Sequence, residues 1–102
     1  MSLSIDQHRA ELAELCRRYG VLSLSLFGSA TRDDFDPQAS DYDFLVEFEA
    51  MPSGRYADAY FGLLESLGQL LGRPIDLVVA SAIKNPYFRQ SVEQTKALLY
   101  AA

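Results

Sequence analysis

The sequence has very little cysteine, since Cys16 is the only one in 102 residues. One thiol cannot form an internal disulfide, and Cys16 falls on the apolar stripe of a predicted helix, so we expect a small core residue rather than a nucleophile. The chain also lacks an apolar run long enough to cross a bilayer and an N-terminus of the secretory-signal type. These absences argue against a disulfide scaffold and a membrane protein, and we expect a soluble cytoplasmic protein.

Basic charge is also scarce. Nine Lys and Arg residues stand against fourteen Asp and Glu residues, which gives a formal net charge of −5, and the bases form no cluster. Proteins that hold extended nucleic acid gain affinity by neutralising its phosphates, so this balance argues against such a partner. It is compatible with one nucleotide bound through metal ions.

The composition is that of a folded protein. Hydrophobic residues make up 49% of the chain, with six Phe and six Tyr, and no segment is repetitive or of low complexity. The length suits one domain with a core of its own, so residues 1–102 are expected to form a single domain.

Periodicity predicts alternating helices and strands. The expected elements are a helix from Ser4 to the stop at Gly20, a strand over 21–27, a strand over 43–48, a helix over about 55–71, a strand over 75–79, and a last helix capped by Asn85. In the first strand, Leu22, Leu24 and Leu26 should face one way and Ser23 and Ser25 the other. Core residues expected to dock the last helix are Phe88, Val92, Leu98 and Leu99.

The fold class that follows is α/β (α+β), with a small mixed sheet and helices packed on it. A helix between the second and third strands permits a parallel pair, because such a crossover returns the chain in the same direction. The short connection between the first two strands leaves their pairing open between antiparallel and mixed arrangements.

Two acids open the second strand, in "SDYDFLVEF". Side chains alternate along a strand, so Asp41 and Asp43 share a face about 7 Å apart. Two carboxylates so close repel, and either protonation or a bound divalent cation relieves the repulsion. Alone, Asp41 is more typical of a turn, and a single Asp-x-Asp pair is weak evidence for a site.

A third acid favours the cation. Asp76 lies within the apolar stretch "PIDLVV", where an aspartate is expected to be paired or bound to metal. If the second and third strands are neighbours, Asp76 approaches the face of Asp41 and Asp43. Three convergent carboxylates predict a magnesium site.

A possible phosphate site precedes these acids. Gly28 and Ser29 follow the first strand, where a strand-to-helix turn would direct free N–H groups outward and favour an anion. Alone, Ser29 would more often be a helix cap. Phosphate donors beside a carboxylate-bound metal together predict a nucleoside triphosphate site.

The combined pattern resembles the minimal nucleotidyltransferases, the small members of the DNA polymerase beta superfamily. Their signature is a Gly-Ser pair, about ten further residues, an Asp-x-Asp pair, and another acid on a later strand. "LFGSATRDDFDPQASDYDFLVEF" and "PIDLVV" match it in order, and "NPYFRQSVEQTKALLY" is similar to the family's terminal helix. The resemblance covers nearly the whole chain and implies a nucleotidyltransferase fold of the polymerase beta type.

The resemblance also implies roles for individual residues. Gly28 and Ser29 would hold the β- and γ-phosphates of ATP, while Asp41, Asp43 and Asp76 would be the catalytic acids and bind two Mg²⁺ ions. Arg32 matches an arginine that often follows the Gly-Ser pair, so it would contact phosphate or form a surface salt bridge. The family's usual next residue is glycine, whereas this chain has Asp33, which adds negative charge near the triphosphate and puts the shape of the turn in question.

The implied reaction is transfer of AMP from ATP to an acceptor hydroxyl. Members of this size resemble the antitoxins of two-gene modules whose partner is a helical HEPN ribonuclease toxin, so the acceptor would be a tyrosine of that toxin. Two alternatives remain open. One is a transferase acting on a small hydroxylated compound or a nucleic-acid end with a separate helical subunit, and the other is a non-catalytic module that blocks its partner. The sequence leaves the oligomeric state open.

Overall fold

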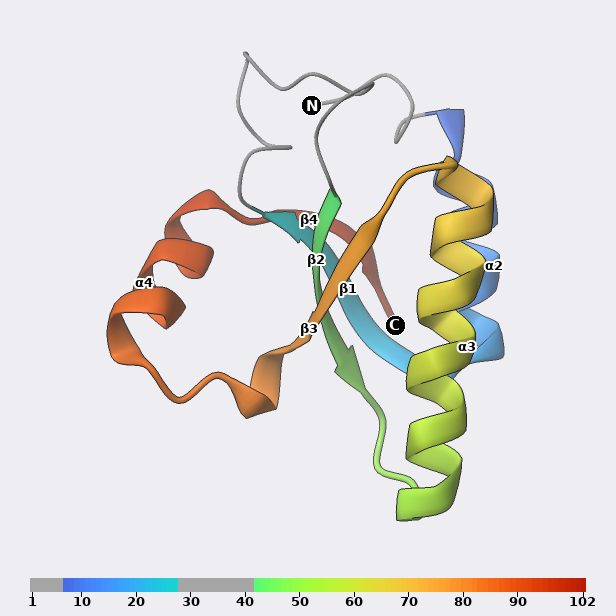
Figure 1. Cartoon of the computed structure of the whole chain (residues 1–102), viewed down its shortest axis with the longest axis horizontal. Coiled ribbons are helices and arrows are strands. Elements are labelled where there is room, and N and C mark those ends of the chain that lie inside the picture. The colour runs from blue at the N-terminus through green and yellow to red at the C-terminus, as the bar shows by residue number, and fades with distance from the viewer. Residues whose placement is uncertain (1–6, 28–41) are drawn as a thin grey trace.

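The computed structural model describes residues 7–27 and 42–102, and these form one mixed sheet with helices on both faces (Figure 1). The elements run in the order α2 (Arg9–Arg18), β1 (Val21–Phe27), β2 (Tyr42–Phe48), α3 (Ser53–Leu71), β3 (Ile75–Val79), the short 3-10 helix η2 (Ala80–Ala82), α4 (Pro86–Thr95) and β4 (Ala97–Ala101). No helix among the described residues is long and apolar enough to cross a bilayer.

The sheet has the strand order β3-β2-β1-β4. Strand β2 pairs with β3 in parallel, and β1 pairs with β2 and with β4 antiparallel. The predicted mixed sheet is therefore confirmed, and the open question of the first pair is answered as antiparallel. The parallel pair is possible because α3 carries the chain back between β2 and β3.

The main core lies between the sheet and the helices α2 and α3, which cover one face together (Figure 1). Its fully buried side chains come from alternate positions of the strands and from one stripe of each helix, namely Leu12, Cys16, Leu24, Leu26, Tyr42, Phe44, Val46, Leu63 and Leu67. Cys16 is completely buried, and this burial raises the pKa of its thiol to about 12. The expectation of a core cysteine is confirmed.

The opposite face carries a smaller cluster. Phe27 and Leu45 of the sheet pack against Ile83 and Val92, so η2 and α4 cover this face only in part. Val92 is the one buried residue of α4, and the helix stands away from the sheet on the side opposite α2 and α3 (Figure 1). Asn85 caps α4 as predicted, because its side-chain oxygen accepts hydrogen bonds from the N–H groups of Tyr87 and Phe88.

The C-terminal end of the chain differs from the prediction. The last helix ends at Thr95, and Leu98 and Leu99 belong to strand β4, so their assignment to the docking face of that helix was wrong. Strand β4 adds to β1 and pairs its outer backbone groups, a non-local gain that helical spacing cannot reveal. The predicted helix start at Ser4 lies outside the described residues.

The side chains buried on each face of β1 also differ from the prediction. A bulge between Val21 and Ser23 changes the alternation, so Val21 is buried while Leu22 is 44% exposed. Leu24 and Leu26 are buried as predicted, but Leu22 does not join them in the core. Ser25, expected on the polar face, is buried as well.

Candidate functional site

Asp43 and Asp76 are direct neighbours in the sheet. They are register partners in the parallel pair of β2 and β3. Adjacent strands lie about 4.8 Å apart and register partners point to the same face, so the two carboxyl groups emerge side by side. Two acids 33 positions apart in the chain are thus brought together by the crossover through α3.

The surroundings of Asp76 differ from what its apolar neighbours suggested. Strand β3 is at the edge of the sheet and Asp76 is exposed, whereas Asp43 in the inner strand β2 is half-buried. The neighbours Leu77 and Val78 are apolar because they pack into the clusters on the two faces, not because Asp76 is enclosed by them. Because Asp76 is exposed, burial is no reason to expect it to be paired or bound to metal. Its closeness to Asp43 is the observation that supports a metal site.

The end of β1 lies on the other side of Asp43. Phe27, the last residue of β1, is the antiparallel register partner of Asp43. Gly28 and Ser29 follow Phe27 directly in the sequence. The predicted site residues Gly28, Ser29, Arg32 and Asp41 lie outside the described residues.

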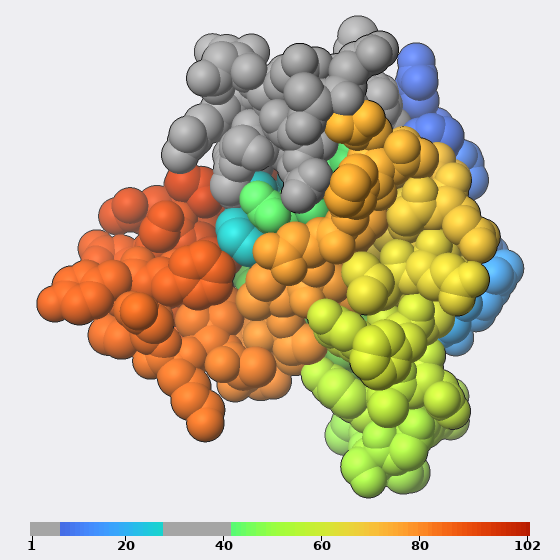
Figure 2. Space-filling model, in the orientation of Figure 1, coloured from blue at the N-terminus to red at the C-terminus, as the bar shows by residue number. Residues whose placement is uncertain are grey.

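The two acids occupy the sheet face that α2 and α3 do not cover. Along β2, Tyr42, Phe44 and Val46 enter the main core, and Asp43 and Leu45 point the other way. Between α4 and β3, parts of β1 and β2 reach the surface (Figure 2). The acids therefore face the side of the molecule from which a substrate can enter.

The residues Asp43 and Asp76 suit a hard divalent cation. Magnesium prefers carboxylate oxygens and commonly binds through one or two carboxylates while keeping positions for water and phosphate. Within residues 7–27 and 42–102, no group of three potential metal ligands occurs. The described part of the site is a two-carboxylate pair, with Asp41 as the predicted third ligand.

Tyr60 of α3 contacts the strand that carries Asp76. It is half-buried on α3, and its hydroxyl donates a hydrogen bond to the carbonyl of Leu77, with a distance of 2.7 Å. Burial, followed by the charges of Asp76 and the nearby Tyr56, raises the pKa of the Tyr60 hydroxyl. Tyr60 thus ties the strand that carries Asp76 to α3, a contact that helical spacing alone does not reveal.

Phe88 of α4 contacts the end of β1. Its ring packs edge-on against Phe27, with ring centroids 6.0 Å apart and planes at 73°. Since Phe27 pairs with Asp43, this contact joins the N-terminal part of α4 to the strand end next to Asp43. The sequence predicted Phe88 as a docking residue, which this contact confirms, but gave no reason to place it near the site.

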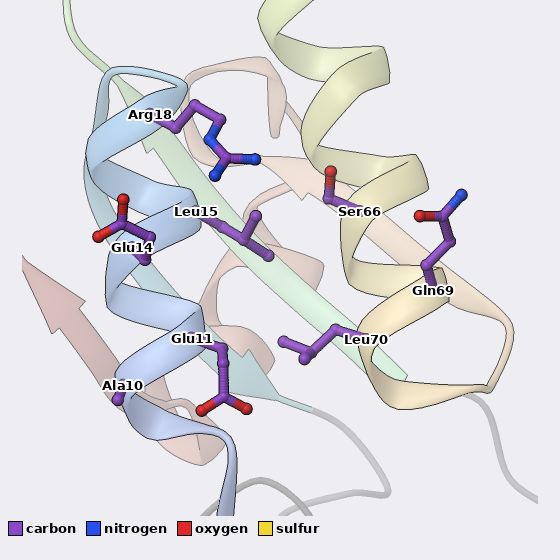
Figure 3. Close-up of a pocket in the computed structure, with 8 residues that line it drawn as sticks. All are labelled: Ala10, Glu11, Glu14, Leu15, Arg18, Ser66, Gln69 and Leu70. Carbon is purple, nitrogen blue, oxygen red and sulfur yellow. The ribbon is translucent and has the colours of Figure 1, made fainter.

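The described residues also line a cavity away from the acids. It has a volume of about 570 Å³ and lies between α2 and α3, where Leu15 and Leu70 face each other below Arg18 and Ser66 (Figure 3). It opens on the helical side of the sheet, away from Asp43 and Asp76. A smaller cavity of about 360 Å³ lies on the same sheet face as the acids, between the sheet and α4, and includes Ser25, Leu45 and Arg89.

Known proteins similar in sequence carry the same kind of domain. Residues 9–99 match the family model of the nucleotidyltransferase domain. A Methanocaldococcus jannaschii protein, provisionally named a protein adenylyltransferase, is 41% identical over 90 residues, which are 88% of this chain and 85% of that protein. The protein adenylyltransferase MntA of Thermococcus cleftensis is 40% identical over 81 residues, 79% of this chain and 75% of its own.

Solved structures share the fold. One provisionally identified as a minimal nucleotidyltransferase has a TM-score of 0.73 at 30% identity and covers 90% of this chain and 89% of its own. A second is a complex of the tri-AMPylated Shewanella oneidensis HEPN toxin with its MNT antitoxin. It has a TM-score of 0.65 at 19% identity and covers 96% of this chain and 73% of the solved one, a likeness of fold alone.

Proposed function

Because this chain belongs to the nucleotidyltransferase domain family, we propose that it transfers AMP from ATP to a hydroxyl group on a partner protein. The single observation that carries the proposal is the register pairing of Asp43 with Asp76 on the uncovered face of the sheet. In this position the two carboxylates can hold magnesium while leaving room for phosphate oxygens.

The acids and the residues that follow β1 have different proposed roles. Asp43, Asp76 and Asp41, which precedes Asp43 by two positions in the sequence, would hold two Mg²⁺ ions, and these would supply the positive charge that triphosphate chemistry requires. Gly28 and Ser29 hold the β- and γ-phosphates, with Arg32 as a further phosphate contact. This division follows the family resemblance for Gly28, Ser29, Arg32 and Asp41, and the sheet register for Asp43 and Asp76.

The reaction is an in-line displacement at the α-phosphorus of ATP. The acceptor oxygen forms the new bond to phosphorus, the bond to the bridging oxygen breaks, and pyrophosphate leaves with the electron pair of that bond. Asp76 lies at the exposed edge, where its carboxylate can take the proton of the acceptor hydroxyl. Positioning and charge neutralisation then account for most of the rate.

We propose a tyrosine of a helical HEPN ribonuclease toxin as the acceptor, which makes this chain the antitoxin of the pair. The MNT antitoxin complexed with an AMPylated HEPN toxin has the fold of this chain, and the MntA relative is named a protein adenylyltransferase. A modified tyrosine carries added bulk and negative charge, which opposes the binding of RNA phosphates. The toxin would be inactivated in this way.

The test is an intact-mass measurement. The chain is incubated with ATP, Mg²⁺ and a candidate HEPN protein found by searching the neighbouring reading frames, and the partner is expected to gain the mass of one or more AMP groups. Asp43→Asn should abolish the gain, because it removes one of the paired carboxylates.

Two other results would lead to different functions. If no nucleotide is added and the toxin is nevertheless inhibited in the complex, the chain is a non-catalytic binding module. If no such partner is encoded and AMP appears on a small hydroxylated compound or a nucleic-acid end, the chain is a transferase of another acceptor class.

A further inference from the structure

The direction from which an acceptor must approach is fixed by the sheet. Helices α2 and α3 cover one face, and Asp43 and Asp76 emerge on the other. On that other face, the described elements beyond the strands are η2 and α4, which stand on the opposite side of the sheet from α2 and α3 (Figure 1). An acceptor protein that reaches the acids must therefore pass close to α4.

The start of α4 exposes two aromatic side chains, one of which contacts the end of β1. Tyr87 is 82% exposed and Phe88 is 41% exposed. Phe88 packs on Phe27, the register partner of Asp43, and Tyr87 is the residue before Phe88 in the same helix. Exposed aromatic side chains next to a site are typical of interface anchors, because they bury much area at little cost in side-chain entropy.

The same segment carries the opposite charge to the rest of the molecule. Residues 80–96 contain three basic side chains, Lys84, Arg89 and Lys96, and one acidic side chain, Glu93, whereas the whole chain has a net charge of −5. All four are exposed. Glu93 pairs with Lys96 at 2.9 Å, which leaves Lys84 and Arg89 as the excess positive charge next to Tyr87 and Phe88. An acidic partner surface is complementary to this segment.

We propose that Lys84, Tyr87, Phe88 and Arg89, the α4 rim, form the docking surface for the acceptor protein, whose acidic surface surrounds the hydroxyl that receives AMP. This inference rests on the proposed function and adds to it the face and the charge of the partner. Tyr87 and Phe88 would be buried by the partner, while Lys84 and Arg89 would steer the acidic surface toward the α4 rim.

The test compares substitutions on the two sides of the molecule. Tyr87→Ala and Lys84→Glu alter the α4 rim, and Phe61→Ala and Arg55→Glu are matched controls on α3, where Phe61 is 64% exposed and Arg55 is exposed. The rate of AMP transfer to the HEPN protein is measured with partner below saturation, together with the KM for ATP. Each variant of the α4 rim should lower kcat/KM for the partner about tenfold, as interface anchors do. The KM for ATP should not change, and the controls should behave as wild type.

Ionic strength supplies a second readout. The KM for the partner should rise with salt in the wild type, and this dependence should be weaker in Lys84→Glu, because screened charges no longer steer the encounter.

Other results would overturn the inference. Unchanged kcat/KM in both variants of the α4 rim would place docking elsewhere. A raised KM for ATP with an unchanged KM for the partner would mean that the α4 rim contacts nucleotide. Loss of self-association with unchanged transfer would mean that it contacts a second copy. Absence of transfer by the wild type would instead refute the proposed function.

Discussion

At the scale of single residues, the site depends on where alternation places each carboxylate. Asp43 and Asp76 each follow a residue of the main core, Tyr42 and Ile75, so each points to the opposite face. A shift of one residue in either strand would separate the two acids by the thickness of the sheet. The apolar residues that fix the register of β2 and β3 are thus as necessary to the pair as the acids themselves.

Tyr60→Phe should weaken the support of Asp76 while retaining the aromatic ring in the core. The hydroxyl donates to the Leu77 carbonyl at 2.7 Å, and a hydrogen bond of this kind contributes about 1 kcal/mol to stability. We expect the free energy of unfolding to fall by about 1 kcal/mol, which lowers the melting temperature. We also expect a lower kcat at an unchanged KM for ATP. Thermal unfolding and transfer kinetics measure both effects, and Tyr56→Phe is the control. An unchanged kcat would show that the bond is purely structural.

The thiol of Cys16 should be inert in the folded protein. Its burial raises its pKa to about 12, so almost no thiolate exists near pH 8 and reagents have no access. A thiol reagent should label Cys16 only after denaturant is added. The raised pKa also has a consequence for stability. The folded state retains the proton to higher pH than the unfolded chain, so stability should fall as pH rises from about 9 toward 12. Rapid labelling of the native protein would contradict this description of the core.

At the scale of elements, α2 and α3 approach closely where α3 has a glycine. A methyl group built on Gly62 would come within 2.6 Å of the Tyr19 ring, whereas one on Gly54, in the same helix, would meet nothing within 4 Å. Gly62→Ala should therefore destabilise the fold by about 1–3 kcal/mol through overpacking. Gly54→Ala should stabilise it by up to about 1 kcal/mol through helix propensity. Urea unfolding of both variants measures the difference, and equal effects would contradict this packing.

The elements also show what the sequence can predict. Strands β1 and β3 and the capped start of α4 were predicted at their observed residues, because turn residues and caps are local signals. Strand β4 was missed, because "ALLYA" becomes a strand only by pairing with β1, more than seventy positions earlier. The bulge that exposes Leu22 is likewise a property of the paired strands and not of either one alone.

At the scale of the whole molecule, the main core and the candidate site lie on opposite faces of the sheet. The face covered by α2 and α3 contains the main core, and the face partly covered by η2 and α4 carries Asp43 and Asp76. The stability of the fold and the proposed chemistry therefore depend on different side chains. Substitutions of the exposed Asp76 should leave the melting temperature of the metal-free protein nearly unchanged.

For the candidate site, the helix between the second and third strands allowed a parallel pair but did not establish it. The structure shows that the two strands are parallel neighbours and that Asp43 and Asp76 are register partners. The roles of all the predicted site residues, Gly28, Ser29, Arg32, Asp41, Asp43 and Asp76, stay predictions. The contributions of Tyr60 and Phe88 could not be predicted, since they depend on how α3 and α4 lie against the sheet edge and the end of β1.

The central claim is that two acids from adjacent strands hold the divalent cation used in nucleotide transfer. Its most direct test is a calorimetric titration of Mg²⁺ in the presence of a non-hydrolysable ATP analogue, for the wild type, Asp76→Asn, and Asp58→Asn on the exposed surface of α3 as control. Asp76→Asn should weaken the affinity for Mg²⁺ by at least about tenfold, and Asp58→Asn should not change it. Wild-type affinity in Asp76→Asn would contradict the account.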